Sequence, residues 1–235
     1  MPTRNSSQTR ATIPALALFL FALLTGCATA HRTATPLPET QPFAKEINAF
    51  TAADATHPPP RSAILFVGSS SIRLWKTLAQ DFPDLRVVNR GFGGSQLIDS
   101  VNYADRVILP CKPRHIVLYA GGNDINAKKT PQQVFADFQA FVAKVHSELP
   151  RTRISYISIA PNPARWAQVD KVREANRLIE EYTRRDNRLG FINVFPHMLG
   201  PDGQPLPDIF VADRLHMNPK GYELWKGIVG PHLRR

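Results

Sequence analysis

The chain has 235 residues, of which 43% are hydrophobic, and it carries a formal net charge of +10 at pH 7. That length suits one domain with a sizeable core, and the basic charge favours anionic surfaces as partners. No nucleic-acid partner is expected, because the basic residues are scattered and no nucleic-acid-binding motif is present. Anionic lipid, a cell-wall polymer or simple solvation of the surface accounts better for the charge.

The chain begins with the pattern of a secretory signal. Arg4 and Arg10 form a basic region ahead of the apolar stretch Ala11–Leu24. That stretch has 14 residues, whereas a membrane-spanning helix needs about 20. We therefore expect a signal peptide over residues 1–26 and export of the remainder.

The segment at the expected cleavage site, Leu24–Ala28, reads Leu-Thr-Gly-Cys-Ala and resembles the lipobox of bacterial lipoproteins. The resemblance implies that Cys27 becomes the lipidated first residue of the mature protein, which tethers it to a membrane without spanning it. Ala28, in place of an acidic sorting residue, favours the periplasmic face of the outer membrane in the cell envelope. An ordinary signal cleaved near Ala28 or Ala30 is the alternative.

Two linking segments are expected before the main domain. Residues 27–42 are rich in Thr, Ala and Pro, which is typical of a flexible tether. Residues 43–60 contain Phe43, Ile47 and Phe50 at helical spacing and end in a run of prolines. This second segment is therefore predicted to be a short helix followed by a proline-rich linker.

From residue 61 to residue 235, short apolar runs alternate with helical patterns. Strands are predicted over Ala63–Val67, Leu85–Asn89, His115–Ala120, Arg153–Ile159 and Gly190–Val194. Helices are predicted over Ser71–Phe82, Ser95–Ile108, Pro131–Leu149, Gln168–Arg185 and Pro219–Val229. This alternation predicts an α/β domain, a three-layer α/β/α flavodoxin-like sandwich with a five-stranded parallel sheet.

Four turns rich in glycine or polar residues follow predicted strands. Gly68–Ser71 follows the first strand, Asn89–Ser95 the second and Gly121–Asp124 the third, and a loop after the last strand leads to Asp213–His216. Ligands bind beyond the carboxyl ends of parallel strands. All four turns are therefore expected at one edge of the sheet.

Each turn has a chemical interpretation and a plainer one. A serine at a strand-to-helix bend exposes its hydroxyl and its amide, but such a serine more often only caps the helix. Asp213 and His216 are spaced as an orienting carboxylate and a general base, although that spacing alone is close to chance. The glycines bring a backbone N–H close to an oxyanion, or they simply reverse the chain. The joint occurrence of all four turns in this order favours the chemical interpretation.

Together the turns resemble the sequence blocks of the SGNH hydrolases, also called GDSL esterases or lipases. Those blocks are Gly-Asp-Ser-Leu, Asn-x-Gly-x-x-Gly, Gly-x-Asn-Asp and Asp-x-x-His. The resemblance implies that Ser70 is the nucleophile, His216 the base and Asp213 the residue that orients the base. It further implies an oxyanion hole built from the Ser70 amide, the Gly94 amide and the Asn123 side chain, with no metal and no cofactor.

The similarity runs from about Ala63 to the C-terminus and includes one departure. Ser69 stands where the family has an aspartate before the nucleophile. That aspartate is not a member of the triad, so activity is expected to survive. The register within three consecutive serines stays open: alignment on Gly68 favours Ser70, and Ser71 is then expected to hydrogen-bond the start of the helix.

The resemblance implies a serine esterase or acylhydrolase that cleaves carboxylic esters through an acyl-enzyme. The family acts on lipids, thioesters and acetylated sugars. Deacetylation of an envelope carbohydrate is favoured by the expected location, with a lipase, a lysophospholipase or a thioesterase as alternatives. Ala160–Asp170 is expected to wall the pocket, where Arg165 and Trp166 contact the substrate or merely pack on the surface.

Two other classes are compatible with the fold. A non-catalytic binding lipoprotein is disfavoured because all four blocks are retained. A nucleotide- or flavin-binding protein requires Gly-x-Gly-x-x-Gly after the first strand, whereas the glycine turn here follows the second strand and has Gln96 in place of its last glycine. The remaining histidines lack metal-ligand spacing, and Cys111 has no disulfide partner if Cys27 is lipidated.

Overall fold

The computed structural model describes residues 1–3 and 35–234. The chain divides into two units, Met1–Arg32 and Thr33–Arg235, and the second contains the features described below. Residues 4–26 of the expected signal peptide, Cys27 and the first part of the tether lie outside the described residues. Within the described ranges, no helix combines the length and the apolar character that crossing a membrane requires.

Five short strands form a single parallel sheet in the order β2-β1-β3-β4-β5. The strands are β1 (Ile64–Gly68), β2 (Val87–Gly91), β3 (His115–Tyr119), β4 (Arg153–Ile157) and β5 (Leu189–Ile192). Each differs from its predicted bounds by at most two residues. The predicted five-stranded parallel sheet is confirmed, and all five carboxyl ends lie at one edge.

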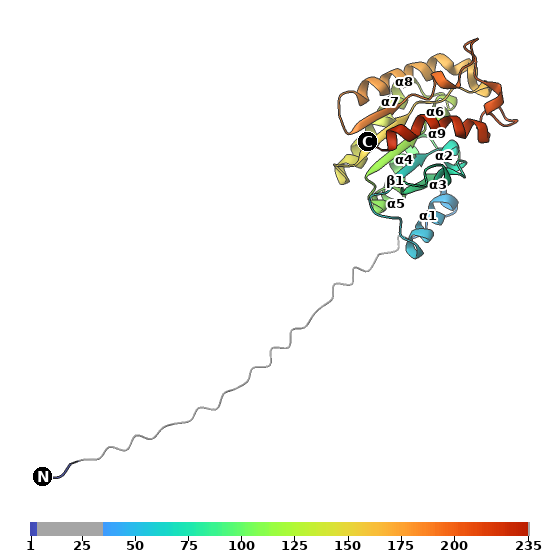
Figure 1. Ribbon diagram of the computed structural model, residues 1–235. Coiled ribbons are helices and arrows are strands. Elements are labelled where there is room, and N and C mark those ends of the chain that lie inside the picture. The colour runs from blue at the N-terminus through green and yellow to red at the C-terminus, as the bar shows by residue number, and fades with distance from the viewer. Residues whose placement is uncertain (4–34, 235) are drawn as a thin grey trace. The chain divides into compact units, whose positions relative to one another are not determined.

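Helices cover both faces of this sheet, which confirms the three-layer architecture (Figure 1). One layer contains α1 (Ala44–Thr56), α4 (Leu97–Asn102), α5 (Ala104–Val107), α6 (Gly122–Asn126), α7 (Pro131–Glu148) and α8 (Val169–Thr183). The other contains α2 (Ser70–Arg73), α3 (Leu78–Asp81) and α9 (Pro219–Leu233). Alternate residues of β1 belong to the two cores, with Leu65 and Val67 under the first layer and Phe66 under the second.

Two of the predicted helices are broken. The expected helix Ser71–Phe82 is instead α2 followed by α3. At the break, Asn89 Nδ2 donates to the carbonyl oxygen of Ile72 at 2.6 Å and to that of Trp75 at 3.4 Å, which satisfies acceptors at the end of α2. The expected helix Ser95–Ile108 is α4 and α5, and it begins late because Gln96 and Asp99 form a capping box there.

α1 is joined to β2 by a buried arginine. Arg90 is 4% exposed, and its Nη2 lies 2.5 Å from Asp54 Oδ1 on α1. The ring of Phe50, also on α1, lies 4.9 Å from the guanidinium carbon. The same Nη2 is 3.7 Å from the buried Cys111 Sγ. One polar cluster thus holds α1 against both β2 and the segment that follows α5.

Candidate active site

The bend after β1 depends on Gly68. Its φ is +130°, and a Cβ atom there would lie 1.9 Å from the carbonyl oxygen of Tyr119, so only glycine fits. The next residue, Ser69, donates its N–H to that same oxygen at 3.0 Å, and α2 begins at Ser70. The side chain of Ser69, at the N-cap, makes no capping hydrogen bond. The side chain of Ser71, expected to hydrogen-bond the helix start, instead hydrogen-bonds Tyr119.

Asp213, His216 and Ser70 form a continuous chain of hydrogen bonds. His216 Nε2 lies 2.8 Å from Ser70 Oγ, and His216 Nδ1 lies 2.6 Å from Asp213 Oδ2. The other oxygen of Asp213 accepts the N–H groups of Leu215 and His216, each at 2.9 Å. The hydrogen bond from the His216 backbone, followed by that from its ring, lowers the pKa of Asp213 to about 2. The carboxylate is therefore ionised at neutral pH, and Nε2 faces the serine as an acceptor.

The structure brings one of the three consecutive serines against the histidine. Ser70 Oγ is the hydroxyl bonded to His216, while Ser69 is 6% exposed and buried under the bend. Ser71 is held through its carbonyl oxygen, which accepts the Tyr222 hydroxyl of α9 at 2.9 Å. Of the three serines, Ser70 is therefore the one whose hydroxyl faces His216.

The loop that carries Asp213 and His216 is fixed at its end by Asn218. This residue caps α9 by accepting the N–H groups of Lys220 and Gly221. Its Nδ2 also donates to the carbonyl oxygen of Phe210 at 3.1 Å. The last helix and the acid-histidine loop are therefore held in one arrangement.

Of the groups expected to form an oxyanion hole, Ser70 and Asn123 line one pocket, whereas Gly94 does not line it. Asn123 Oδ1 accepts Arg165 Nη1 at 3.0 Å, which orients the amide, and its Nδ2 donates one hydrogen to the carbonyl oxygen of Ser95 at 3.0 Å. The second hydrogen on Nδ2 stays available. Gly94 is exposed with φ +79°. Within the described part of the chain, neither its N–H nor that of Ser70 donates a hydrogen bond.

Asp124, the residue after Asn123, ties two of the turns together. Its side chain is fully buried and accepts the N–H of Leu97, at the start of α4, at 3.2 Å. Lys129 Nζ donates to the same carboxylate at 3.0 Å. Burial raises the pKa of Asp124 despite these donors. The sequence revealed the acid in its motif but gave no signal for this bracing role, which joins segments far apart in the chain.

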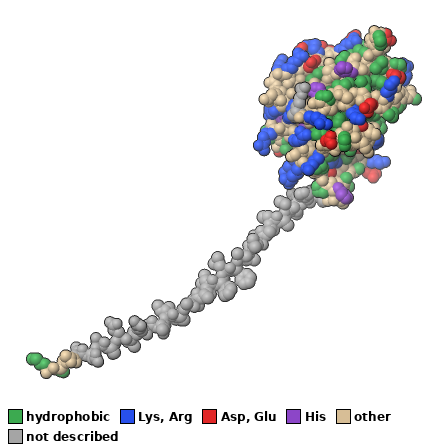
Figure 2. Space-filling view, viewed as in Figure 1, with side chains coloured by type: hydrophobic (Ala, Val, Ile, Leu, Met, Phe, Trp, Pro, Cys, Tyr) green, Lys and Arg blue, Asp and Glu red, His purple; other side chains and the backbone are tan. Residues whose placement is uncertain are grey.

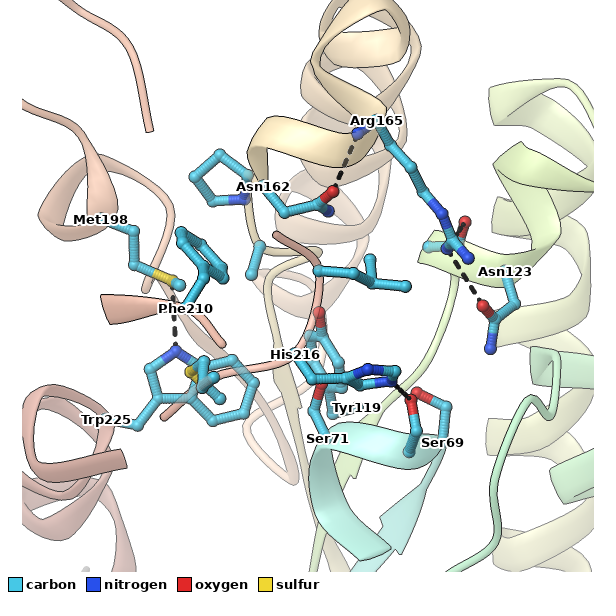
Figure 3. Close-up of a pocket in the computed structure, with 16 residues that line it drawn as sticks. Ser69, Ser71, Tyr119, Asn123, Asn162, Arg165, Met198, Phe210, His216 and Trp225 are labelled. Carbon is cyan, nitrogen blue, oxygen red and sulfur yellow. Dashed lines mark hydrogen bonds between the residues drawn. The ribbon is translucent and has the colours of Figure 1, made fainter. Parts of the chain in front are cut away.

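A small pocket opens beside Ser70 Oγ (Figure 3). Its cavity volume is about 30 Å³. Its lining includes Ser70, Asn123, His216, Asn162, Arg165, Tyr119, Met198, Phe210 and Trp225. Trp225 Nε1 donates to Met198 Sδ at 3.2 Å, which braces the apolar side. The pocket thus has a polar mouth and a short apolar wall.

The segment Ala160–Asp170, predicted as a pocket wall, contributes Asn162 and Arg165 to the lining. Figure 3 shows the side chains of Arg165 and Asn123 pointing toward each other. Arg165 Nη1 also donates to the carbonyl oxygen of Gly122 at 3.1 Å, and burial lowers the pKa of the guanidinium. Trp166 does not line this pocket. The contact between Arg165 and Asn123 was not predicted from the sequence.

The site contains no recognisable metal-binding group. Among the described residues, no three His, Cys, Asp or Glu side chains are grouped so that they could hold a metal ion.

Comparisons with known proteins give the family. A family model described as GDSL-like lipase/acylhydrolase matches residues 65–224. No curated protein matches the chain by sequence. A Streptococcus pneumonia structure described as a platelet activating factor is 22% identical, covers 80% of this chain and 91% of its own, and has a TM-score of 0.73. A GDSL-like lipase from Bacteroides thetaiotaomicron is 18% identical, with coverages of 82% and 98% and a TM-score of 0.69.

A family 3 carbohydrate esterase from Talaromyces cellulolyticus is 17% identical, with coverages of 73% and 96% and a TM-score of 0.56. At such identities the solved structures establish the fold alone. The family model, by contrast, spans most of the chain. This protein therefore belongs to the GDSL-like lipase/acylhydrolase family, whose chemistry is the hydrolysis of esters.

Proposed function

We propose that the protein is a serine esterase that removes a small acyl group through an acyl-enzyme on Ser70. The observation that carries the proposal is the hydrogen-bonded chain from Asp213 through His216 to Ser70 Oγ at the carboxyl edge of the sheet. A serine, an imidazole and an ionised carboxylate in this order form the arrangement that activates a hydroxyl nucleophile.

The reaction follows from the positions of the hydrogen bonds. His216 Nε2 accepts the proton of Ser70 Oγ as the oxygen attacks the ester carbonyl carbon. The oxyanion of the tetrahedral intermediate accepts hydrogen bonds from the Ser70 N–H, the Gly94 N–H and Asn123 Nδ2. His216 then gives its proton to the alcohol oxygen as the C–O bond breaks. A water molecule then gives a proton to His216 as its oxygen attacks the carbonyl carbon of the acyl-enzyme. His216 passes that proton to Ser70 Oγ as the bond to the acyl group breaks and the acid leaves.

The size of the pocket supports a short acyl group. A cavity needs about 10–15 Å³ to hold one water molecule, and the cavity beside Ser70 has about 30 Å³. That space suits a group of two or three heavy atoms, such as acetyl. The buried side chains of Met198, Phe210 and Trp225 form the apolar part of its lining. An acetyl ester is therefore favoured over the long acyl chain that a lipase or thioesterase would accept.

The polar mouth of the pocket supports a hydroxyl-rich alcohol. Asn162 and Arg165 line it with hydrogen-bonding groups, and these suit a carbohydrate better than an alkyl chain. The expected export of the chain and its anchor at Cys27 would bring the enzyme to envelope carbohydrates. We therefore propose an O-acetylated sugar of the cell envelope as substrate, with the enzyme lipid-anchored on the periplasmic side of the outer membrane.

The nucleophile is tested by labelling with a fluorophosphonate, followed by peptide mapping. Label on Ser70 that disappears in His216→Ala is the expected result, with Ser69→Ala and Ser71→Ala as matched controls that keep it. Label on another serine would reassign the nucleophile. A folded protein that takes no label would reject the esterase and favour a binding role.

The acyl preference is tested with nitrophenyl esters of increasing chain length. We expect kcat/KM to fall from acetate to butyrate to octanoate. A maximum at octanoate would instead assign a lipase or thioesterase.

The anchor is tested separately by incorporation of a fatty-acid probe into the expressed chain. Loss of the probe in Cys27→Ala is expected. Incorporation that is unaffected by this change would reject lipidation at Cys27.

A further inference from the structure

The edge of the sheet opposite Ser70 carries a concentration of positive charge. This amino edge consists of the segments that lead into the five strands: 57–63, 82–86, 108–114, 149–152 and 184–188. Together they contain eight Arg or Lys residues and two acidic residues, and Arg153 adds a further charge as the first residue of β4. The basic residues that are scattered in the sequence are thus gathered in the fold.

The carboxyl edge has a different charge balance. Its segments, which follow the strands, are 69, 92–96, 120–121, 158–168 and 193–218. They contain two basic and three acidic residues. The positive charge is therefore a property of one edge and not of the domain surface as a whole. Figure 2 shows Lys and Arg side chains, in blue, along the side of the domain on which Figure 1 marks the C-terminus.

The register of the sheet aligns the arginines. Arg86 directly precedes β2, Arg114 precedes β3 and Arg188 precedes β5. Backbone hydrogen bonds join the strands at these positions. Arg153 N donates to the Arg114 carbonyl oxygen at 3.1 Å, and Ile154 N donates to the Arg188 carbonyl oxygen at 2.9 Å. Adjacent strands lie about 4.8 Å apart. The five strands therefore spread these charges over a breadth of about 20 Å.

Most of these charges lack a carboxylate partner. Arg184 and Arg188 form ion pairs with Glu180 and Asp186 at 2.7 and 2.6 Å. Six exposed basic side chains have no carboxylate within 4 Å in the described part of the chain: Arg61, Arg86, Lys112, Arg114, Arg151 and Arg185. Three of them, Lys112, Arg114 and Arg151, line one shallow groove together with Glu148. The amino edge is thus a broad surface of uncompensated cations.

We propose that the amino edge is a docking surface for the anionic headgroups of a phospholipid bilayer. A guanidinium donates two parallel hydrogen bonds to a phosphate, and five of the six unpaired side chains are arginines. The second unit exposes a single large hydrophobic side chain among its described residues, Val211, and it lies on the opposite edge. Binding would therefore be electrostatic and peripheral, with little insertion into the acyl region.

A bilayer fits this surface better than a soluble polymer does. The charges cover a breadth of sheet edge and are not confined to a channel along which a strand-like polymer would lie. A lipid anchor at Cys27, where present, would also hold the domain within reach of headgroups. Docking would then turn Ser70, at the far end of the strands, away from the bilayer. This last consequence rests on the proposed function and favours a substrate that is not a lipid of the same membrane.

The test is co-sedimentation of the full chain with vesicles of phosphatidylcholine alone or mixed with phosphatidylglycerol. The edge variant is R86Q/R114Q/R151Q, in which three exposed arginines become neutral. The control variant is K45Q/K76Q/K171Q, which removes the same charge from exposed lysines elsewhere in the domain. Comparison of the two variants cancels any vesicle binding by the N-terminal segment. Circular dichroism and Tm establish that both variants fold.

We expect phosphatidylglycerol to increase the affinity of the parent chain for vesicles. The edge variant should bind these vesicles more weakly by on the order of 100-fold, since each surface charge contributes about tenfold or less. The control variant should lose only a few-fold. Equal losses in both variants would overturn the proposal and leave net charge as the explanation. Unchanged binding by the edge variant would also overturn it. Binding of soluble polyphosphate that depends on the edge, without vesicle binding, would assign the surface to a polymer. Fluorophosphonate labelling of Ser70 in the same preparations reports the esterase independently.

Discussion

The two edges of this sheet are built from the same five strands but are used in different ways. At the carboxyl edge the chain leaves the first three strands through short turns and the last two through longer loops, and hydrogen bonds fix Ser70, His216 and Asn123. At the amino edge four of the five strands begin at or directly after an arginine, and β3 begins with the buried histidine His115. The comparison teaches that strand direction alone separates two chemistries in a parallel sheet, because residues before and after the same strand lie at opposite ends.

The largest effect is expected from Ser70→Ala at the carboxyl edge. Loss of the nucleophile should lower kcat by about 10,000-fold or more. Because the side chain is half-buried and its Oγ makes a single hydrogen bond, to His216, Tm should change little. Steady-state kinetics on nitrophenyl acetate and a thermal melt provide the two measurements. Full activity in this variant, with loss in Ser71→Ala, would move the nucleophile by one residue.

Asn123→Ala should lower kcat on the order of 100- to 1,000-fold, because one donor to the oxyanion is lost. KM should change less than kcat, since the donor acts on charge that develops in the transition state. Kinetics over a range of substrate concentrations separates the two constants. An effect confined to KM would indicate that Asn123 binds the substrate ground state and does not stabilise the oxyanion.

At the amino edge, His115 should affect stability and leave catalysis unchanged. Burial, followed by the positive charges of Arg153, Arg114 and His232, lowers the pKa of His115 to about 4 from its ordinary 6.5. The unfolded chain therefore binds a proton first as the pH falls. The contribution of neutral His115 to the free energy of unfolding is fully present above about pH 6.5. It is lost as the pH falls toward 4, by roughly 3 kcal/mol at most.

Urea unfolding at several pH values between 4 and 7.5 measures this dependence. His115→Gln should flatten the curve and leave kcat on nitrophenyl acetate unchanged at pH 7.5. The Nε2 contact with Ser155 Oγ, at 2.8 Å, is then replaced by an amide that does not titrate. Identical pH slopes in the variant and the parent chain would assign the acid sensitivity to other groups.

The smallest effect is expected at Arg165, which acts through Asn123. Its guanidinium holds Oδ1 of that amide, so Arg165→Met should release the amide and lower kcat by about 10-fold. Arg165→Lys should restore part of the loss because an ammonium also donates. In the Asn123→Ala background the Arg165→Met change should cost little, since the two act as a unit. Additive losses would show that Arg165 contacts the substrate independently of Asn123.

Much of the fold was predictable because it depends on local patterns. The strand runs and the alternation with helices gave the parallel sheet, and the positions of Gly68, Asn123 and His216 after strands gave the location of the site. The helix break near Trp75 was not predictable, because the contact that accompanies it, between Asn89 and Ile72, joins residues 17 positions apart. The orientation of Asn123 by Arg165 depends on a contact across 42 residues. Such contacts follow from tertiary packing and leave no periodic trace in the sequence.

The buried thiol of Cys111 can report local opening of the helix layer that contains α1 and α5. Its Sγ lies 3.5 Å from the carbonyl oxygen of Val107 and beside Arg90, the residue that joins α1 to β2. Burial raises its pKa, so the folded state resists alkylation. Modification would have to wait until α1 and α5 separate from the sheet. The half-time of alkylation would therefore report how often α1 separates locally from the sheet, which the hydrogen bonds of the folded state alone do not reveal.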